Sequence, residues 1–421
     1  MSSKLVPKVR FKEFSGEWEE KRIGDIGHFY YGKSAPKWSL DEKAPTKCVR
    51  YGELYTKFGA TITETYSRTN IDPEKLKFSK GGEILVPRVG ERPEEFGKCC
   101  SYLPLKNIAI GEMISVFNTK QNPLFYTYYF RNMWAEFSKV VEGQNVKNLY
   151  YKELEPLKIY QPILLEQQKI ADTFSSLDNL IEVQTKKVEL LKSHKKGLMQ
   201  KLFPRDGAKV PEVRFKEFSG EWKKEKISEI IDVIDGDRGK NYPKENDFSN
   251  NDYCLFLNAK NVTKNGFVFD TLKFISKNKD NLMTKGKLKP FDIVLTTRGT
   301  LGNFAYFTED IPFKNIRINS GMVILRKKSN KLLSNYIYYF FKTEFITNSI
   351  KNMAFGNAQQ QLTLINIKKQ IIYFSKDTQE QQKIANTFSS LDNLIEAQTK
   401  KIELLKEHKK GLMQKMFVGD K

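Results

Sequence analysis

The stretch EQQKIADTFSSLDNLIEVQTKKVELLKSHKKGLMQKLF runs from Glu166 to Phe203. From Glu380 to Phe417 the chain repeats it as EQQKIANTFSSLDNLIEAQTKKIELLKEHKKGLMQKMF. Of the 38 positions only five differ, and we call the two copies the long blocks. Most of the sequence between them does not repeat, so we infer that the two long blocks serve one purpose that requires the same sequence in both.

Apolar residues recur in each long block at alternating steps of four and three, the heptad pattern of a coiled-coil seam. The apolar seam positions are Ile170, Phe174, Leu177, Ile181, Val188 and Leu191 in the first block and Ile384, Phe388, Leu391, Ile395, Ile402 and Leu405 in the second. We expect two helices, each roughly 50 to 57 Å long, that pack antiparallel about a pseudo-twofold axis. The alternative is that each helix lies on a globular core.

Polar residues interrupt this seam at Gln184 and Lys195, and at their copies Gln398 and Lys409. Inside a coiled coil they would lower stability while fixing the register. Alternatively, the lysines lie beyond the paired region and are solvated. Glycine in a helix costs about 1 kcal/mol relative to alanine, so the helices are expected to end or bend near Gly197 and its copy.

A shorter repeat lies upstream of each long block. VPKVRFKEFSGEWEEKRIGDI (Val6 to Ile26) returns as VPEVRFKEFSGEWKKEKISEI (Val210 to Ile230), with 14 of 21 positions identical. The chain is therefore two half-units, each a short block, a variable region and a long block. The predicted segments are 1–26 and 204–230 for the short blocks and linker, 27–165 and 231–379 for the variable regions, and 166–203 and 380–421 for the helices.

Positive charge is concentrated in the variable regions. The chain of 421 residues carries a net charge of +21, of which residues 27–165 and 231–379 hold +15. A hydrophobic share of 39% is enough for packed interiors, and the length suggests two or three domains. Such an excess of basic residues favours an anionic partner, most often nucleic acid.

Several classes of protein are disfavoured by what the sequence lacks. It has no apolar leader at the N-terminus and no apolar run of 18 residues, so we expect a cytoplasmic protein without membrane contact. Four cysteines and three histidines show no paired spacing, so neither a zinc site nor a disulfide framework is expected. Phosphate-binding and methyltransferase motifs are also missing, so the sequence is typical of a binder without catalytic residues.

Each variable region is predicted to be one mixed α and β domain. GGEILVPRVGERPEEFGKCCSYL (Gly81 to Leu103) and PFDIVLTTRGTLGNFAYF (Pro290 to Phe307) share a strand, an arginine, a glycine turn and a second strand. A further strand and an aromatic helix follow in both regions. The tyrosine and phenylalanine runs of that helix are expected in the core, although such rings can also stack on unpaired bases.

Candidate DNA-contacting residues lie near these turns and in the polar stretches that follow the aromatic helices. Amide side chains can bond adenine bidentately and arginine can bond guanine, although either can equally contact phosphate or stabilise its own turn. Arg88 and Arg298 are interpreted as equivalent positions after a strand. The candidates are Arg88, Arg92, Gln144, Asn145, Lys147, Arg298, Asn357, Gln359, Gln360 and Gln361.

The layout resembles the specificity subunits of Type I restriction-modification systems. Two EQQKIA…FSSLDNLIE segments, each after a variable domain, carry the resemblance across essentially the whole chain. It implies an α+β fold, with two mixed α/β target recognition domains joined by two long helices that pair as an antiparallel coiled coil. Each domain would read one half of a split DNA sequence, and the helices would set the spacing and dock partner subunits.

The resemblance also implies the partners of the chain. These are double-stranded DNA, two methyltransferase subunits and, in the full complex, restriction subunits. S-adenosylmethionine, ATP and Mg²⁺ are expected in those partners and no cofactor in this chain, which would itself be non-catalytic. The alternatives are a stand-alone DNA-modifying or DNA-cleaving enzyme, and a DNA-binding regulator that dimerises through the seam.

Overall fold

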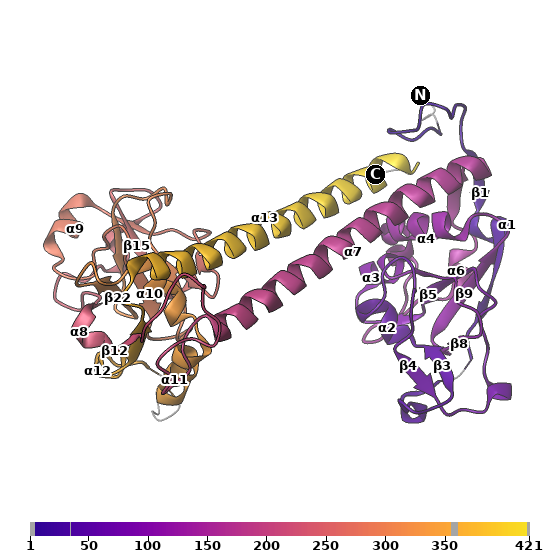
Figure 1. Ribbon diagram of the computed structural model, residues 1–421. Helices are drawn as coiled ribbons and strands as arrows, with labels where there is room; N and C mark the ends of the chain where they lie inside the picture. Colours follow the sequence, from indigo (N-terminus) through magenta and orange to yellow (C-terminus); the bar gives the residue numbers. More distant parts are fainter. Residues whose placement is uncertain (1–4, 34, 355–360, 419–421) are drawn as a thin grey trace. The chain divides into compact units, whose positions relative to one another are not determined.

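The half-unit organisation of the sequence determines how the chain divides in space. The computed structural model describes residues 5–33, 35–354 and 361–418 (Figure 1). Unit 1 comprises Met1–Lys186 with Thr399–Lys421, and unit 2 comprises Lys187–Gln398. Each unit therefore holds one variable region together with part of each long block.

Unit 1 is built around an antiparallel sheet in the order β2-β9-β5-β7. Its strands are β2 (Gly27–Tyr31), β9 (Ile114–Thr119), β5 (Glu83–Pro87) and β7 (Ser101–Leu103). All five residues of β5 are buried, because the helices α3 (Pro93–Lys98) and α4 (Pro123–Asn132) pack on this part of the unit. A second sheet has the order β4-β3-β8, from β4 (Ser67–Thr69), β3 (Thr46–Val49) and β8 (Ala109–Ile110), and the remaining short helices are α1 (Ile23–Ile26), α2 (Tyr51–Thr56), α5 (Trp134–Lys139) and α6 (Tyr151–Leu154).

Unit 2 repeats this topology with different side chains. Its main sheet has the order β13-β22-β19-β20, formed by β13 (Ile231–Asp235), β22 (Met322–Lys327), β19 (Ile293–Thr296) and β20 (Phe304–Tyr306). Its second sheet includes β15 (Cys254–Leu257) and β21 (Ile316–Ile318), which pair in parallel as β3 and β8 do in unit 1. The unit also contains β14 (Phe248–Ser249), β16 (Val262–Thr263), β17 (Gly266–Phe267), β18 (Phe274–Ile275), α8 (Ile227–Ile230), α9 (Lys277–Leu282), α10 (Ser334–Phe341), α11 (Glu344–Ala354) and α12 (Leu364–Lys368). The prediction of two mixed domains with one fold is confirmed.

The aromatic helices form the cores of both units. The expected single helix is divided in both units, at Met133 between α4 and α5 in unit 1 and at Lys342 and Thr343 between α10 and α11 in unit 2. In each unit most of the aromatic side chains are buried, including Phe125, Tyr126, Phe130, Tyr336, Phe340 and Phe341. The interpretation of these rings as core residues is confirmed, and they are not available to stack on bases.

Each short block pairs with the strand that precedes a long helix and so joins the two ends of a variable region. In unit 1, β1 (Glu19–Arg22) of the short block pairs antiparallel with β11 (Lys158–Gln161), which directly precedes the helix. In unit 2, β12 (Lys223–Lys226) pairs in the same way with β23 (Ile371–Phe374). The two repeats thus meet, although a whole variable region separates them in the sequence.

The long blocks form the helices α7 (Leu164–Lys201) and α13 (Thr378–Met416). Both start two residues before the predicted segments. Both helices continue without interruption through Gly197 and Gly411, so the expected end at these glycines is wrong. An added Cβ at either glycine would meet open space. Within the described residues, no helix is both long enough and apolar enough to cross a bilayer.

The two helices pair antiparallel within each unit. In unit 1 Phe174, near the start of α7, stacks on Phe417 just after α13, with ring centroids 5.7 Å apart. In unit 2 Phe203, just after α7, stacks on Phe388 near the start of α13, at 5.8 Å. Every predicted seam position is buried or half-buried. The predicted fold class is confirmed, and the helix ends also pack into the domain cores, so the alternative of a helix on a core holds for these ends.

Candidate nucleic-acid interface

Three loops of unit 2 meet at one edge of its main sheet. They follow β13, follow β19 and precede β22, and strand pairing places these ends side by side, with Asp235 opposite Val323 and Thr296 opposite Met322. Backbone N–H groups of residues 297 and 298 donate to the carbonyl of Gly321 at 2.8 and 3.2 Å. We call residues 236–243, 297–303 and 319–321 the loop edge of unit 2.

Unit 1 has a loop edge at the corresponding place, formed by residues 32–33, 88–92, 111–113 and 142–148. The Arg88 N–H donates to Met113 O at 3.0 Å, and Lys33 N–H donates to Ile110 O at 2.9 Å. The polar stretch joins the edge through β6 (Val89–Gly90), which pairs antiparallel with β10 (Lys147–Asn148). Residues that lie far apart in the sequence therefore form one surface in each unit.

Arg88, one of the predicted DNA contacts, lies against two aromatic rings of unit 1. Its guanidinium carbon lies 4.7 Å from the centre of the Tyr31 ring and 5.7 Å from that of Tyr150. Burial raises the pKa of the Tyr31 hydroxyl, and the charge of Arg88 opposes that shift. The Arg88 Nε is buried and has no hydrogen-bond partner among the described residues. A planar cation fixed on two rings is well suited to a flat acceptor such as a base edge or a phosphate.

The other candidates of unit 1 lie around Arg88. Gln144 and Asn145 are exposed at the tip of the polar stretch, and the Lys147 ammonium donates to Gly143 O at 2.6 Å. Arg92 is exposed and pairs with Glu95 at 3.5 Å. The structure therefore brings all five candidates of this half to one loop edge, where their roles remain predictions.

In unit 2 the predicted residues are only partly within the described chain. Arg298 is exposed on the loop edge, and Gln361 lies beside it because the Leu362 N–H donates to Thr297 O at 3.0 Å. Asn357, Gln359 and Gln360 fall outside the described residues. The two described candidates of unit 2 therefore lie on the loop edge or directly beside it.

The predicted equivalence of Arg88 and Arg298 is wrong by one position. In unit 1 Leu149 N–H donates to Arg88 O, and in unit 2 Leu362 N–H donates to Thr297 O. Strand register agrees, since Pro87 lies opposite the first residue of β9 as Thr296 lies opposite the first residue of β22. Thr297 thus occupies the place of Arg88. The two arginines were aligned on their neighbouring glycines, whereas the β-ladder sets the true correspondence.

Sequence reasoning missed the loop that follows the first strand of each main sheet. It begins at Gly32 in unit 1 and at Gly236 in unit 2, where an added Cβ would lie 2.1 Å from Gly111 O and 2.2 Å from Asn319 O. Only glycine permits this close approach. Both glycines stand at the displacement of 204 residues that also relates the short blocks, which is the signal that could have identified them.

A buried carboxylate shapes this loop in unit 2. Asp237 accepts hydrogen bonds from the N–H groups of Gly239 and Thr284, both at 2.8 Å. Burial alone would raise the Asp237 pKa, but the backbone hydrogen bonds outweigh it and lower the pKa. The flanking Arg238 and Lys240 are exposed, and Arg238 donates to Ser320 O at 3.2 Å. Two further cations thus lie on this loop edge, and Arg238 is held there by its hydrogen bonds.

A second region, the constant frame, joins each short block to the start of a long helix. Arg10 donates two hydrogen bonds to Glu166, at 2.8 and 2.7 Å, and Arg214 donates two to Glu380, at 2.7 and 2.8 Å. Both carboxylates are fully buried. One turn further along, Lys169 forms an ion pair with a glutamate of the short block, as its copy does in unit 2. Sequence reasoning missed these pairs, although all their members lie in the repeats.

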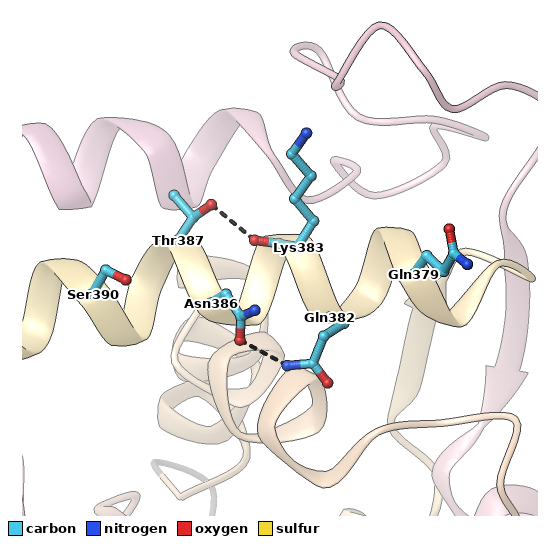
Figure 2. A pocket seen from close by; sticks show the side chains of 6 residues that line it. All are labelled: Gln379, Gln382, Lys383, Asn386, Thr387 and Ser390. Atoms are coloured by element: carbon cyan, nitrogen blue, oxygen red, sulfur yellow. Dashed lines mark hydrogen bonds between the residues drawn. The ribbon is translucent and has the colours of Figure 1, made fainter.

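The outer face of the helix start is also repeated. In unit 2 a shallow groove of about 450 Å³ is lined by Gln379, Gln382, Lys383, Asn386, Thr387 and Ser390 (Figure 2). There the Gln382 amide donates to Asn386 Oδ1 at 2.7 Å and the Thr387 hydroxyl to Lys383 O at 2.8 Å. In unit 1 Gln168 donates to Asp172 at 2.8 Å in the same way. Each unit therefore offers nearly the same polar face.

The ionisable side chains of the described ranges form no group of three His, Cys, Asp or Glu residues arranged to hold a metal ion. Three of the cysteines, Cys48, Cys100 and Cys254, are buried. Burial raises the pKa of the Cys48 thiol to about 11 and that of the Cys254 thiol to about 12. These thiols stay protonated near neutral pH.

Known specificity subunits resemble this chain over its whole length. The Type I restriction enzyme MjaVIII specificity subunit of Methanocaldococcus jannaschii is 27% identical, over 97% of this chain and 95% of the relative. The putative type I restriction enzyme MjaX specificity subunit of the same organism is 23% identical, over 98% and 95%. The S subunit of a Type-I restriction-modification system from M. genitalium has the same fold, with a TM-score of 0.65 at 18% identity over 99% of this chain and 100% of that one.

A family model covers both half-units. The model described as the Type I restriction modification DNA specificity domain matches residues 15–193 and, a second time, residues 219–407. Each match spans the end of a short block, a variable region and most of a long helix. The chain therefore belongs to the family of Type I restriction modification DNA specificity domains and carries two copies of that domain.

Proposed function

We propose that this chain is the DNA-recognition subunit of a Type I restriction-modification complex and that it is itself non-catalytic. Each loop edge reads one half of a bipartite target in double-stranded DNA. The observation that carries this function is the pair of loop edges, which lie at the same strand ends of one sheet topology and differ in their side chains. An asymmetric split target requires two recognition surfaces that share one fold and differ in the side chains that contact the bases.

Charge supports a nucleic-acid partner for both variable regions. The first holds a net charge of +5 and the second +10. Cations such as Arg238 and Arg298 are exposed on the loop edge of unit 2, and Arg88 is fixed on that of unit 1. Affinity for DNA should therefore fall steeply as the salt concentration rises.

The constant frame and the outer helix face dock two methyltransferase subunits in this proposal. A seam needs only apolar residues, yet 33 of 38 positions are the same in both long blocks, including exposed ones such as Ser176 and Ser390. An exposed face kept the same in two copies, beside variable regions that differ, suits two copies of one partner. The helices set the spacing between the half-sites.

Chemistry belongs to the partners. The methyltransferase subunits supply S-adenosylmethionine and the pocket for a flipped adenine, and restriction subunits add ATP- and Mg²⁺-dependent cleavage. Because the substrate is the DNA of the cell, the complex works in the cytoplasm.

A domain exchange tests the two-reader proposal. Residues 27–165 are replaced by the variable region of another specificity subunit, and the methylome of cells with the matching methyltransferase is sequenced. One half-site should change while the other half-site and the spacer stay the same. A change in both half-sites would contradict the proposal, and the reciprocal exchange of residues 231–379 is the matched control.

The purified chain distinguishes the alternative functions. Incubated alone with DNA and S-adenosylmethionine, it should neither methylate nor cleave, and activity without a partner would establish the enzyme alternative. Within each unit the seam is already occupied, as the stacks of Phe174 on Phe417 and of Phe203 on Phe388 illustrate. A regulator that dimerises through the seam would instead be a stable homodimer in light scattering.

A further inference from the structure

A carboxylate on α7 joins three elements of unit 1. Asp178 forms an ion pair with the Lys409 ammonium from α13 and accepts a hydrogen bond from the Tyr128 hydroxyl of α4, at 2.8 Å. The ammonium also lies 5.1 Å from the centre of the Tyr128 ring. One aspartate thus connects the variable region, the helix that follows it and the helix that belongs to the other half of the chain.

Unit 2 contains the same cluster, made from other residues. Asp392 of α13 forms an ion pair with Lys195 of α7 and accepts a hydrogen bond from the Tyr339 hydroxyl of α10 at 3.1 Å. The ammonium lies 5.7 Å from the centre of the Tyr339 ring. We call each Asp, Lys and Tyr set a lock. The lysines are two of the four polar seam residues of the sequence, and their ion pairs with the facing helix place them inside the paired region rather than beyond it.

The lysines occupy positions where an apolar residue would suit the seam better. The side chains of Lys195 and Lys409 are only 17% and 16% exposed. Burial lowers the pKa of Lys409, and the charge and hydrogen bond of Asp178 oppose that shift. A leucine here would remove the desolvation of a charge. The lysine must therefore provide something other than stability, and in coiled coils that is the choice of register.

A heptad seam alone does not choose its register, since sliding by seven residues again places apolar residues against apolar residues. In this chain the ring stacks at the helix ends favour one register. The lysines add a charge interaction that distinguishes this register from its neighbours. In the observed register Lys409 faces Asp178, but a slide of one heptad would place it against Ala171 or Thr185. For Lys195 the shifted partners would be Ala385 or Thr399 instead of Asp392. In every shifted register the ammonium loses its carboxylate.

We propose that the two locks select the register of the helix pair and thereby fix a single spacer length between the half-sites. The inference rests on the proposed function, in which the helices set the spacing. A slide of one heptad would move the helices by about 10 Å, equivalent to about three base pairs. Tyr128 and Tyr339 extend each lock to the reading domain, so the domain keeps its position relative to both helices.

The test replaces both lysines with methionine, K195M/K409M, which keeps the length of the side chain and helix propensity but removes the charge. The matched control is K192M/K406M, because both of those lysines are exposed and also stand at equal positions of the repeat. Each full-length chain is expressed with its methyltransferase, thermal unfolding is measured, and the methylome is sequenced for half-sites and spacer lengths.

For K195M/K409M we expect both half-site sequences to be retained and methylation to appear at additional spacers, shifted by about three base pairs. The control should keep the single wild-type spacer. Exchange of the charges in both locks, with D178K/K409D and D392K/K195D combined, should restore that spacer. A lysine with only a structural role would change the melting temperature and not the distribution of spacers.

A folded K195M/K409M chain that keeps one unchanged spacer would overturn the role of the locks. If that variant does not accumulate as folded protein, the nearly isosteric D178N/D392N variant is tested instead. Additional spacers would support the role of the locks, and one unchanged spacer would overturn it. Failure of the proposed function gives a different result, since wild-type chain would then produce no bipartite methylation at all. The two failures are therefore distinguishable in one data set.

Discussion

Arg10 and Glu166 form two hydrogen bonds to one another, although 156 residues separate them. Arg214 and Glu380 form the same pair in unit 2. Each pair joins a short block to the start of a long helix and thus explains why these two segments repeat together. The variable region is enclosed between them, so its surface can change while the frame stays the same.

Substitution of the buried glutamate should destabilise one unit at a time. E166Q leaves the Arg10 guanidinium without its carboxylate, and the loss of one partner of a buried pair costs about 3–5 kcal/mol. Urea unfolding should show an earlier transition for unit 1 in E166Q and for unit 2 in E380Q. Replacing both partners, as in R10M/E166L, should be close to neutral, and an equal loss in single and double variants would contradict a paired role.

The close backbone contact at Gly32 should make alanine harmful there. In G32A the new Cβ would approach Gly111 O to 2.1 Å, and relief of that overlap must displace the loop edge of unit 1. We expect a loss of about 1–3 kcal/mol in stability. Recognition of the first half-site should also weaken, and G236A should weaken only the second.

A nearby glycine provides the control for this substitution. An alanine at Gly52 in α2 would meet open space, so G52A should leave stability and DNA binding unchanged or slightly improved. Equal effects of G32A and G52A in a binding assay with half-site mutants would rule out the steric explanation.

Arg238 should contribute to the second half-site only. Removal of a fixed cation from the loop edge of unit 2, as in R238A, should weaken specific binding about 10-fold to 100-fold, corresponding to about 1–3 kcal/mol. Titrations of bipartite DNA with each half-site mutated in turn measure this effect. K216A, in the second short block, is the control, and an effect of R238A on the first half-site would contradict the assignment.

The ammonium of Lys342 should produce a pH-dependent stability difference. Burial, and then the positive charge of Lys195, lower the Lys342 pKa to about 8. The folded state thus binds this proton less tightly than the unfolded chain, so the penalty is present at pH 7 and disappears as the pH rises through 8 toward 10.5. K342M should be more stable than wild type by about 2 kcal/mol at pH 7.

The difference between K342M and wild type is the informative quantity here, because buried tyrosines and cysteines of both proteins lose stability at alkaline pH. Guanidinium unfolding at pH 7, 8 and 9.5 should show this difference shrinking. A difference that stays constant over this range would mean that Lys342 has an ordinary pKa.

Alanine substitution at the two helix glycines should increase the stability of the chain. Alanine at Gly197 or Gly411 would meet open space on a continuous helix, so each substitution should stabilise the chain by up to about 1 kcal/mol. Thermal unfolding of G197A/G411A checks the gain. The spacer in the methylome should stay unchanged, since neither residue belongs to a lock.

The sequence predicts those features that depend only on local patterns of residues. The heptad positions from Ile170 to Leu191, the strand before Arg88 and the aromatic helix after Asn122 are each recognisable within a short window. The loop edges are not, because Arg88 meets Leu149, and Gly32 meets Gly111, only through strand pairing. The alignment of Arg88 with Arg298 failed for the same reason, since the β-ladder and not the neighbouring glycine fixes the correspondence.

By itself, the sequence determined the two half-units, the helical seams and the basic character of the variable regions, because repeats, periodicity and charge are properties of the chain read in order. Only the tertiary structure decided that Lys195 faces Asp392 and that Lys409 faces Asp178. A heptad pattern is satisfied by several registers, and the choice among them depends on which charges and which aromatic rings meet when the helices pack.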